Sequence, residues 1–290
     1  MGAQVVSIIN MKGGVGKSTT AVSLCETLAI HHRRRVLLID LDPQTNASIM
    51  AAGAERWGRL REEERTLDFY FEAYALNLKP KPFKSLIERG ISDLKGKPDF
   101  AIAASAPEFR FVERDLIEQF VKKGYHIDAI QKWINERFTN GLKSISSLYD
   151  FVVVDCPPGI SLFAEAALMA ADAILVPTIP DYVSRLGLIA FRRRALRLIE
   201  ERRGGQAKLM VLATKVDESF SLHRSELEVM ADGLGDSLFK VRIPQLVDIA
   251  RAAEWSETVR TFDQKYGAAA PVVTALGEEF LGKLDMVLAA

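Results

Sequence analysis

The stretch NMKGGVGKSTT, residues 10–20, decides the fold of this chain. It contains three glycines, Gly13, Gly14 and Gly16. Without a Cβ, these positions let backbone N–H groups turn inward and wrap phosphate oxygens. Lys17 places a point charge on the β- and γ-phosphates, and the hydroxyl of Ser18 is suited to ligate Mg²⁺. The stretch therefore predicts a phosphate-binding loop, reinforced by the positive end of the helix that follows.

One position departs from the usual phosphate-loop pattern, G-x-x-x-x-G-K-[ST]. That pattern requires glycine where this chain has Met11, and it does not explain a second lysine at Lys12. The loop is either a damaged copy of a common motif or an intact copy of a rarer one. An incidental glycine-rich turn is disfavoured, because strand, glycines, Gly-Lys-Ser and helix follow one another in the required order.

Apolar runs alternate with helical patterns along the chain. The apolar runs lie at 4–10, 34–42, 151–158, 173–178 and 208–217, and the helical patterns at 18–32, 161–171, 181–202 and 220–234. Continuous apolar strands between helices indicate a parallel sheet covered on both faces. The predicted fold class is α/β, with a single doubly wound, mostly parallel sheet of the P-loop NTPase type. In such sheets the working residues lie at the carboxyl ends of the strands.

The segment from about 52 to 147 has a different character. It is charged and mostly helical, and KPKPF (79–83) and GKP (96–98) break it. A short strand candidate at 99–104 precedes helix candidates near 107–122 and 126–138. We expect a mainly helical insertion within a single domain that spans residues 1–290.

The bulk composition excludes several classes of protein. Lys plus Arg equals Asp plus Glu at 38 each, so a nucleic-acid or membrane partner would have to use a local patch. Cys25 and Cys156 form no C-x-x-C pair, which argues against a disulfide framework or a cysteine-rich metal site and favours the cytoplasm. The N-terminus lacks a signal-peptide pattern, and no window reaches the ~18 apolar residues of a membrane span.

Four separated motifs together resemble a known family. KGGVGKST, with a lysine just before the first glycine pair, looks like the deviant Walker A motif of the ParA/MinD family of ATPases, closest to ParA-type partition and positioning members. Three further stretches resemble its switch I, its switch II and the late segment whose Ile-Pro lies against adenine: LLIDLDPQTNAS (37–48), YDFVVVDCPPGIS (149–161) and VRIPQLVDIARAAEW (241–255). The resemblance covers residues 4–50, 99–111 and 149–285.

The resemblance implies a role for each matching residue. Lys12 is the signature lysine, which in this family crosses a dimer interface to the partner's nucleotide. Asp42 orients or activates the attacking water, while Ser18, Asp40 and Asp155 hold Mg²⁺, the two acids largely through its waters. Lys17 and Lys12 stabilise charge during phosphoryl transfer. The implied nucleotide-binding residues are Lys12, Gly13, Gly14, Val15, Gly16, Lys17, Ser18, Thr19 and Pro244.

The implied activity is a slow, Mg²⁺-dependent ATPase that acts as a switch. Two ATP molecules are sandwiched in a homodimer, so nucleotide favours the dimer by linkage. Such a protein partitions or positions DNA or another cargo and is stimulated by a ParB-like protein. The alternative is a regulatory or assembly ATPase that switches a protein complex without DNA, through the insertion at 52–147.

The identity of the base is less constrained. TKVD (214–217) resembles the N/T-K-x-D element with which many GTPases read guanine, through Lys215 and Asp217. A strand followed by a charged turn is the simpler interpretation. The deviant loop and the Ile243-Pro244 pair favour adenine.

A basic stretch suggests how DNA would be bound. Residues 185–208 carry eight basic side chains against two acidic ones, Glu200 and Glu201. Partition members of the family bind DNA without sequence preference through basic residues in this half, and then associate with the nucleoid. The alternative is a solvated basic helix face. The candidate DNA-binding residues are Arg192, Arg193, Arg194, Arg197, Arg202 and Arg203.

The C-terminal stretch LGEEFLGKLDMVLAA (276–290) bears on membrane binding. Its apolar stripe is Leu276, Phe280, Leu284 and Leu288. The polar face has three acidic residues against one lysine, which anionic lipid would repel. We expect a helix that packs in the core, and no membrane partner.

Overall fold

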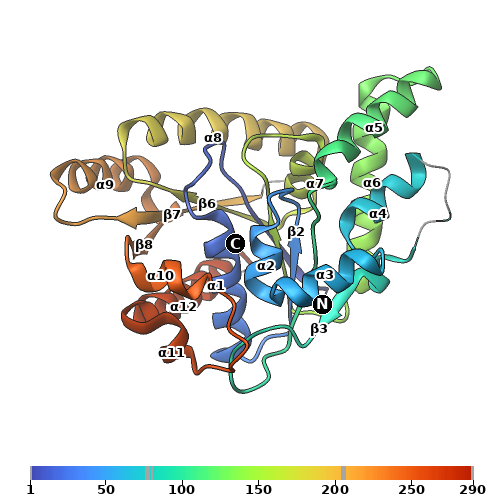
Figure 1. Cartoon of the computed structure of the whole chain (residues 1–290). Helices are drawn as coiled ribbons and strands as arrows, with labels where there is room; N and C mark the ends of the chain where they lie inside the picture. Colours follow the sequence, from blue (N-terminus) through green and yellow to red (C-terminus); the bar gives the residue numbers. More distant parts are fainter. Residues whose placement is uncertain (1, 76–78, 80, 204–206, 289–290) are drawn as a thin grey trace.

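The computed structural model of the protein describes residues 2–75, 79, 81–203 and 207–288. Its centre is an eight-stranded sheet in the order β3-β4-β2-β5-β1-β6-β7-β8 (Figure 1). Neighbouring strands run parallel, except that β3 is antiparallel to β4. The predicted α/β fold class is confirmed. The strands are β1 (Gln4–Ile8), β2 (Val36–Asp40), β3 (Ile87–Arg89), β4 (Phe100–Ala103), β5 (Phe151–Asp155), β6 (Ala173–Thr178), β7 (Lys208–Val216) and β8 (Leu238–Pro244).

Helices cover both faces of this sheet. They are α1 (Lys17–Ile30), α2 (Asn46–Ala52), α3 (Ala54–Glu62), α4 (Leu67–Ala75), α5 (Phe109–Lys122), α6 (Ile127–Ile145), α7 (Leu162–Ala170), α8 (Tyr182–Arg203), α9 (Ser221–Leu234), α10 (Val247–Ala252), α11 (Phe262–Tyr266) and α12 (Ala270–Leu288). Three short 3₁₀ turns are η1 (Phe83–Leu86), η2 (Gly235–Ser237) and η3 (Gly267–Ala269).

Successive residues of each inner strand enter two different cores. Val152 and Val154 of β5 pack with α4 to α8, whereas Val153 between them packs with α1, α2 and α12. Leu37 and Leu38 of β2 divide in the same way. This follows from the two-residue period of a strand. It explains why the inner strands read as continuous apolar runs in the sequence.

The segment 52–147 contributes to the sheet as well as to its helical cover. β4 pairs with β2, and β3 adds an antiparallel edge. Helices α4, α5 and α6 gather at the end of the sheet away from α9 (Figure 1), and they bury Phe71, Phe109 and Phe138 in the same core as α7 and α8. α6 continues to Ile145, seven residues beyond the predicted end near 138.

Two strands were not expected from the sequence. β3 has three residues, too few for a periodic pattern. β8 alternates partly buried and exposed positions along LFKVRIP, because it forms the other edge of the sheet. The predicted core helix at the C-terminus is present as α12, whose Leu276, Phe280 and Leu284 are buried against α1 and the sheet. The side chain of Leu288 lies outside the described residues. In the described parts of the chain, no helix is long and apolar enough to cross a membrane.

Candidate active site

A cavity of about 670 Å³ lies at the carboxyl ends of the central strands. The glycine loop leads from β1 into α1 and forms its floor. Residues from switch I and α2 line one wall, and residues after β5, in β7 and after α10 complete it. The lining residues are Gly13, Gly14, Gly16, Lys17, Ser18, Thr19, Asp42, Gln44, Asn46, Ile49, Met50, Pro158, Lys215 and Ala253.

The loop backbone is shaped for an anion. Gly14 and Gly16 have φ angles of 73° and 84°, a left-handed conformation that glycine adopts without strain. α1 begins at Lys17 without a side-chain cap and without an acid in its first turn. Its first N–H groups are therefore available to an anion in the cavity.

Lys17 is the buried lysine of the loop. Its side chain lies in the cavity wall, the residue is only 6% exposed, and its Nζ lies 3.4 Å from the carbonyl oxygen of Lys12. Burial lowers the pKa of Lys17, and the nearby charges of Asp155 and Asp42 oppose that shift. A bound polyphosphate would favour the charged ammonium in the same way as these carboxylates.

Asp40 and Asp155 are opposite one another at the ends of β2 and β5, and both are fully buried. Asp40 accepts hydrogen bonds from the N–H of Asp42 (3.0 Å) and from the N–H (2.8 Å) and hydroxyl (2.6 Å) of Ser48. These bonds tie switch I to the start of α2. Burial raises the pKa of Asp40 to about 7, although the bonds from Ser48 and Asp42 oppose it.

Asp155 has no such partners. Neither of its carboxylate oxygens forms a hydrogen bond of good geometry, although the Ser18 hydroxyl is near enough to favour its charged form. Burial, followed by the charge of Asp40, raises the pKa of Asp155 well above its ordinary value. A buried carboxylate without a donor requires either a proton or a cation.

This carboxylate fits Mg²⁺ that is held in part by other groups. Within the described residues, no cluster of three His, Cys, Asp or Glu side chains could hold a metal by itself. Mg²⁺ usually takes one or two protein ligands and completes its shell with phosphate oxygens and water. The Ser18 hydroxyl and Asp155 match that requirement, while the oxygens of Asp40 are already engaged with switch I.

Asp42 lies in the cavity wall, 6% exposed, where switch I turns sharply. Its carboxylate accepts the N–H of Gln44 (2.9 Å), and its carbonyl accepts the N–H of Thr45 (2.9 Å). Thr45 has a φ of 59°, which permits the reversal into α2. One carboxylate oxygen of Asp42 is thus left for a group in the cavity.

Lys12 points away from the cavity. Its Nζ lies 3.2 Å from a carboxylate oxygen of Asp181 and 3.0 Å from the hydroxyl of Ser184, at the start of α8. The side chain remains 44% exposed. Burial alone would raise the pKa of Asp181, but hydrogen bonds from Ser184 and Lys12 outweigh it and lower this pKa.

The opposite end of the cavity is formed by Lys215 and Ala253. Lys215 has a φ of 53°, uncommon for a residue with a side chain, beside the register shifts between β7 and β8. Pro244 pairs with Val216 and does not line the cavity. The carboxylate of Asp217 accepts the N–H and hydroxyl of Ser219, outside the cavity. The geometry therefore does not bring Lys215 and Asp217 together in the cavity, which agrees with the simpler interpretation of TKVD as a strand followed by a charged turn.

Several residues of the site were not singled out from the sequence. Ile49 and Met50, which form the α2 wall, are two of them. The residues TNAS (45–48), within the stretch that resembles switch I, were the part of the sequence from which α2 could have been predicted. Asp181 is at the carboxyl end of β6, where working residues are expected in this fold, but nothing in its local sequence links it to Lys12.

The candidate DNA-binding residues lie along α8. The side chains of Arg192, Arg193, Arg194 and Arg197 are exposed. The side chains of Arg202 and Arg203, at the end of the helix, lie outside the described residues.

Comparison with known proteins identifies the family. A family model described as an AAA domain matches residues 3–206. The chromosome partitioning protein ParA of Myxococcus xanthus is 25% identical over 279 residues, which cover 96% of this chain and 88% of that protein. The chain belongs to the ParA/MinD family of ATPases.

Solved structures share the fold of this ParA/MinD-family chain at low identity. Apo McdA of Cyanothece superposes with a TM-score of 0.69 at 18% identity, covering 96% of this chain and 99% of McdA. Cobyrinic acid a,c-diamide synthase of Mycobacterium smegmatis, with bound ADP and magnesium, superposes with a TM-score of 0.68 at 19% identity, covering 96% and 94%. Because these likenesses show the fold alone, function has to be argued from the site.

Proposed function

We propose that this protein is a ParA-type switch ATPase that hydrolyses ATP to ADP and phosphate and forms a homodimer around two ATP molecules. The observation that carries this proposal is the cavity in which the glycine loop, Lys17 and Asp42 meet above the unpartnered carboxylate of Asp155. Uncapped loop amides and a buried lysine suit a triphosphate, and a buried acid beside a serine hydroxyl suits its magnesium ion.

Each residue has a distinct task in this mechanism. The Ser18 hydroxyl and Asp155 would hold Mg²⁺, which would supply positive charge to neutralise the phosphate oxygens. Lys17 and the amides of Gly14 and Gly16 hold those oxygens in place. Asp42 accepts a hydrogen bond from the attacking water and orients it. Asp40 keeps Asp42 in position through the bonds that it accepts from switch I.

Lys12 links hydrolysis to dimerisation in this proposal. In the isolated chain its ammonium is held by Asp181 and Ser184 at the surface. In the ATP-bound dimer it leaves them and contacts the phosphates of the partner's nucleotide. Such a contact supplies charge in trans and makes ATP part of the interface.

Replacement of Lys12 tests this function directly. Lys12→Ala is expected to lose ATP-dependent dimerisation and hydrolysis while nucleotide binding survives. Light scattering after gel filtration, phosphate release and fluorescent-nucleotide binding measure the three properties. Lys132→Ala, which removes an exposed lysine on α6, is the control. Normal dimerisation and turnover in Lys12→Ala would show that Lys12 is only a surface charge with no role in either process.

DNA is the proposed binding partner of the ATP-bound dimer, either as the cargo itself or as the surface on which another cargo is positioned. Arg194 and Arg197 are exposed on α8, and contacts of arginine with phosphates give sequence-independent, salt-sensitive binding. We expect ATP-dependent binding to random duplex DNA, measured by filter retention with ATP, ADP and no nucleotide. Arg194→Glu with Arg197→Glu should weaken it, whereas Lys132→Ala should not. A ParB-like protein would stimulate turnover.

A regulatory ATPase that switches a protein complex without DNA is the second candidate. The α5–α6 pair leaves four large apolar side chains exposed on its surface: Phe111, Val121, Tyr125 and Ile127. Such side chains suit a protein contact. The absence of nucleotide-dependent DNA binding in the same filter assay would favour this candidate.

A further inference from the structure

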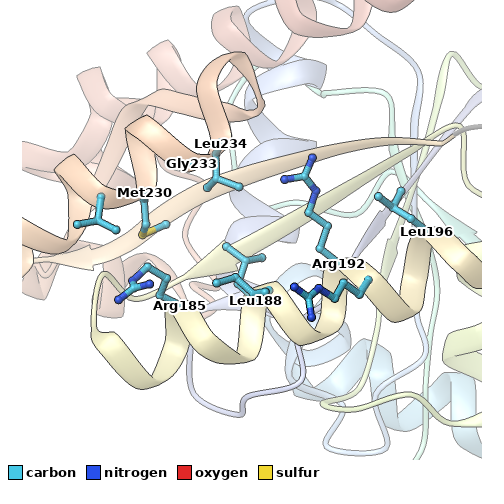
Figure 2. Close-up of a pocket in the computed structure, with 10 residues that line it drawn as sticks. Arg185, Leu188, Arg192, Leu196, Met230, Gly233 and Leu234 are labelled. Atoms are coloured by element: carbon cyan, nitrogen blue, oxygen red, sulfur yellow. The ribbon is translucent and has the colours of Figure 1, made fainter.

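A groove of about 440 Å³ separates α8 from α9 on the surface of the molecule (Figure 2). It shares no lining residue with the nucleotide cavity. Along α8 it extends from Arg185 to Leu196, which at ~1.5 Å per helical residue is about 17 Å, or three turns of a helix. A second hollow, whose lining includes Glu200, Lys208 and Ser237, continues it past Arg192 and Leu196.

The floor of the groove is apolar. Leu188 and Met230 are buried at its base, with Leu196 and Leu234 beside them. Ile189 on α8 and Val229 on α9 are 42% and 47% exposed on its two sides. Gly233 leaves an opening in the α9 wall, since a Cβ there would meet no atom within 4 Å. Covering apolar surface of this kind with a partner lowers the free energy.

Two of the three arginines on the rim of the groove have no acidic ion-pair partner among the described residues. Three arginines, Arg185, Arg192 and Arg193, line it, and no acidic residue does. Arg185 is paired with Glu226 at 2.6 Å. Among the described residues, no carboxylate forms an ion pair with Arg192 or Arg193. The groove therefore offers two free guanidinium groups above an apolar floor.

The arginines of α8 fall into two sets. Arg192 and Arg193 line the groove, whereas Arg194 and Arg197 are exposed but do not line it. At about 100° per residue, Arg193 and Arg197 lie one turn apart on α8, so the two sets adjoin at the rim of the groove. A flat row of basic residues suits a phosphate backbone, while arginines over an apolar floor suit a ligand that is both apolar and acidic.

We propose that the groove between α8 and α9 binds a short, acidic amphipathic helix of another protein. Apolar side chains spaced four and three residues apart would fill the floor, as helices do in hydrophobic grooves. Aspartate or glutamate on the flank of that helix would pair with Arg192 and Arg193. The three-turn length and the continuation past Leu196 favour a peptide over a small amphiphilic anion. This proposal does not depend on nucleotide hydrolysis.

A displayed library of random helical peptides tests the groove. The library is selected on the wild-type protein and counter-selected on Arg192→Glu with Arg193→Glu. Selected peptides should be rich in Asp and Glu and should carry apolar residues at helical spacing. Fluorescence anisotropy of one such peptide should show binding weakened about tenfold or more by that double variant, and also by Val229→Asp. Arg194→Glu with Arg197→Glu should leave it within about twofold.

Other outcomes overturn the proposal. These are selected peptides without an acidic excess, no peptide that depends on the groove, or equal weakening by both pairs of arginine variants. Saturable binding of dodecanoate that requires Arg192 and Arg193, without any peptide, would assign the groove to a small amphiphile. Loss of DNA binding in the groove variant alone would assign these arginines to nucleic acid. Fluorescent-ATP binding and melting temperature verify that each variant is folded.

Discussion

The two lysines of the glycine loop lie five residues apart and have opposite surroundings. Lys17 is buried in the wall of the nucleotide cavity, while Lys12 is half exposed and held by Asp181 and Ser184. A buried ammonium needs an anion, because desolvation makes the unpaired charge costly. A surface ion pair contributes little and is readily exchanged for another partner. The loop therefore combines one fixed charge with one that can be released.

The largest effect is expected from the fixed charge. Lys17→Ala removes a buried ammonium and should weaken ATP binding by about a hundredfold, since charge-assisted bonds to phosphate are among the strongest in proteins. Lys12→Ala should change ATP affinity by no more than about threefold, as expected for an exposed charge. Isothermal titration of both variants under conditions that keep the chain monomeric measures the contrast. Equal losses of affinity would erase the distinction between the two lysines.

An intermediate effect is expected from pH, through the buried acids Asp40 and Asp155. Burial raises the pKa of Asp40 from its ordinary value of 3.8 to about 7. Between these two pH values the folded, nucleotide-free protein therefore binds more protons than the unfolded chain. Its stability should fall as pH rises from about 5 to 7, and level off above the folded pKa. The pKa of Asp155 is raised in the same direction. Thermal melting across this range should show a decreasing Tm.

The affinity for magnesium should depend on pH in the opposite direction to the stability of the nucleotide-free protein. The ion competes with protons for the buried carboxylates, so affinity for Mg²⁺ in the presence of ATP should increase with pH, by at most about tenfold per unit for each proton released. Asp155→Asn should flatten both profiles. A Tm that rises from pH 5 to 7 without nucleotide would contradict the assignment of raised pKa values.

The smallest effect is expected from the contact that holds Lys12. Asp181→Ala removes the partner of Lys12 and also the carboxylate that accepts the N–H of Ser184 (2.8 Å) at the start of α8, so it should lower the free energy of unfolding by about 1 kcal/mol. It should increase the population of ATP-bound dimer by a few fold, because Lys12 no longer has to leave Asp181. Sedimentation velocity with ATP measures this, with Asp128→Ala on α6 as a matched acidic control. A dimer population that decreases would show that Asp181 supports the interface instead.

The parts of the site that were predictable from the sequence share one property. Asp155 ends a buried strand, and Asp42 and the loop from Gly13 to Ser18 come soon after buried strands, so local spacing places them at one edge of the sheet. In contrast, edge strand β8 was missed, because exposed and charged residues interrupt its apolar pattern. The charged turn after β7 was predictable from TKVD, and in it the carboxylate of Asp217 accepts the N–H of Ser219 outside the cavity.

The sequence by itself determined the sheet, the phosphate loop and the membership of an ATPase family, since residue type and short-range spacing control backbone freedom, burial and phosphate chemistry. Only the tertiary structure decided where Lys12 points and that α8 divides its arginines between an open face and a groove. Both depend on contacts between distant segments: Lys12 and Asp181 are 169 residues apart, and Glu226 of α9 meets Arg185 of α8 across 41. Such contacts leave no local pattern, because each partner alone reads as an ordinary surface residue.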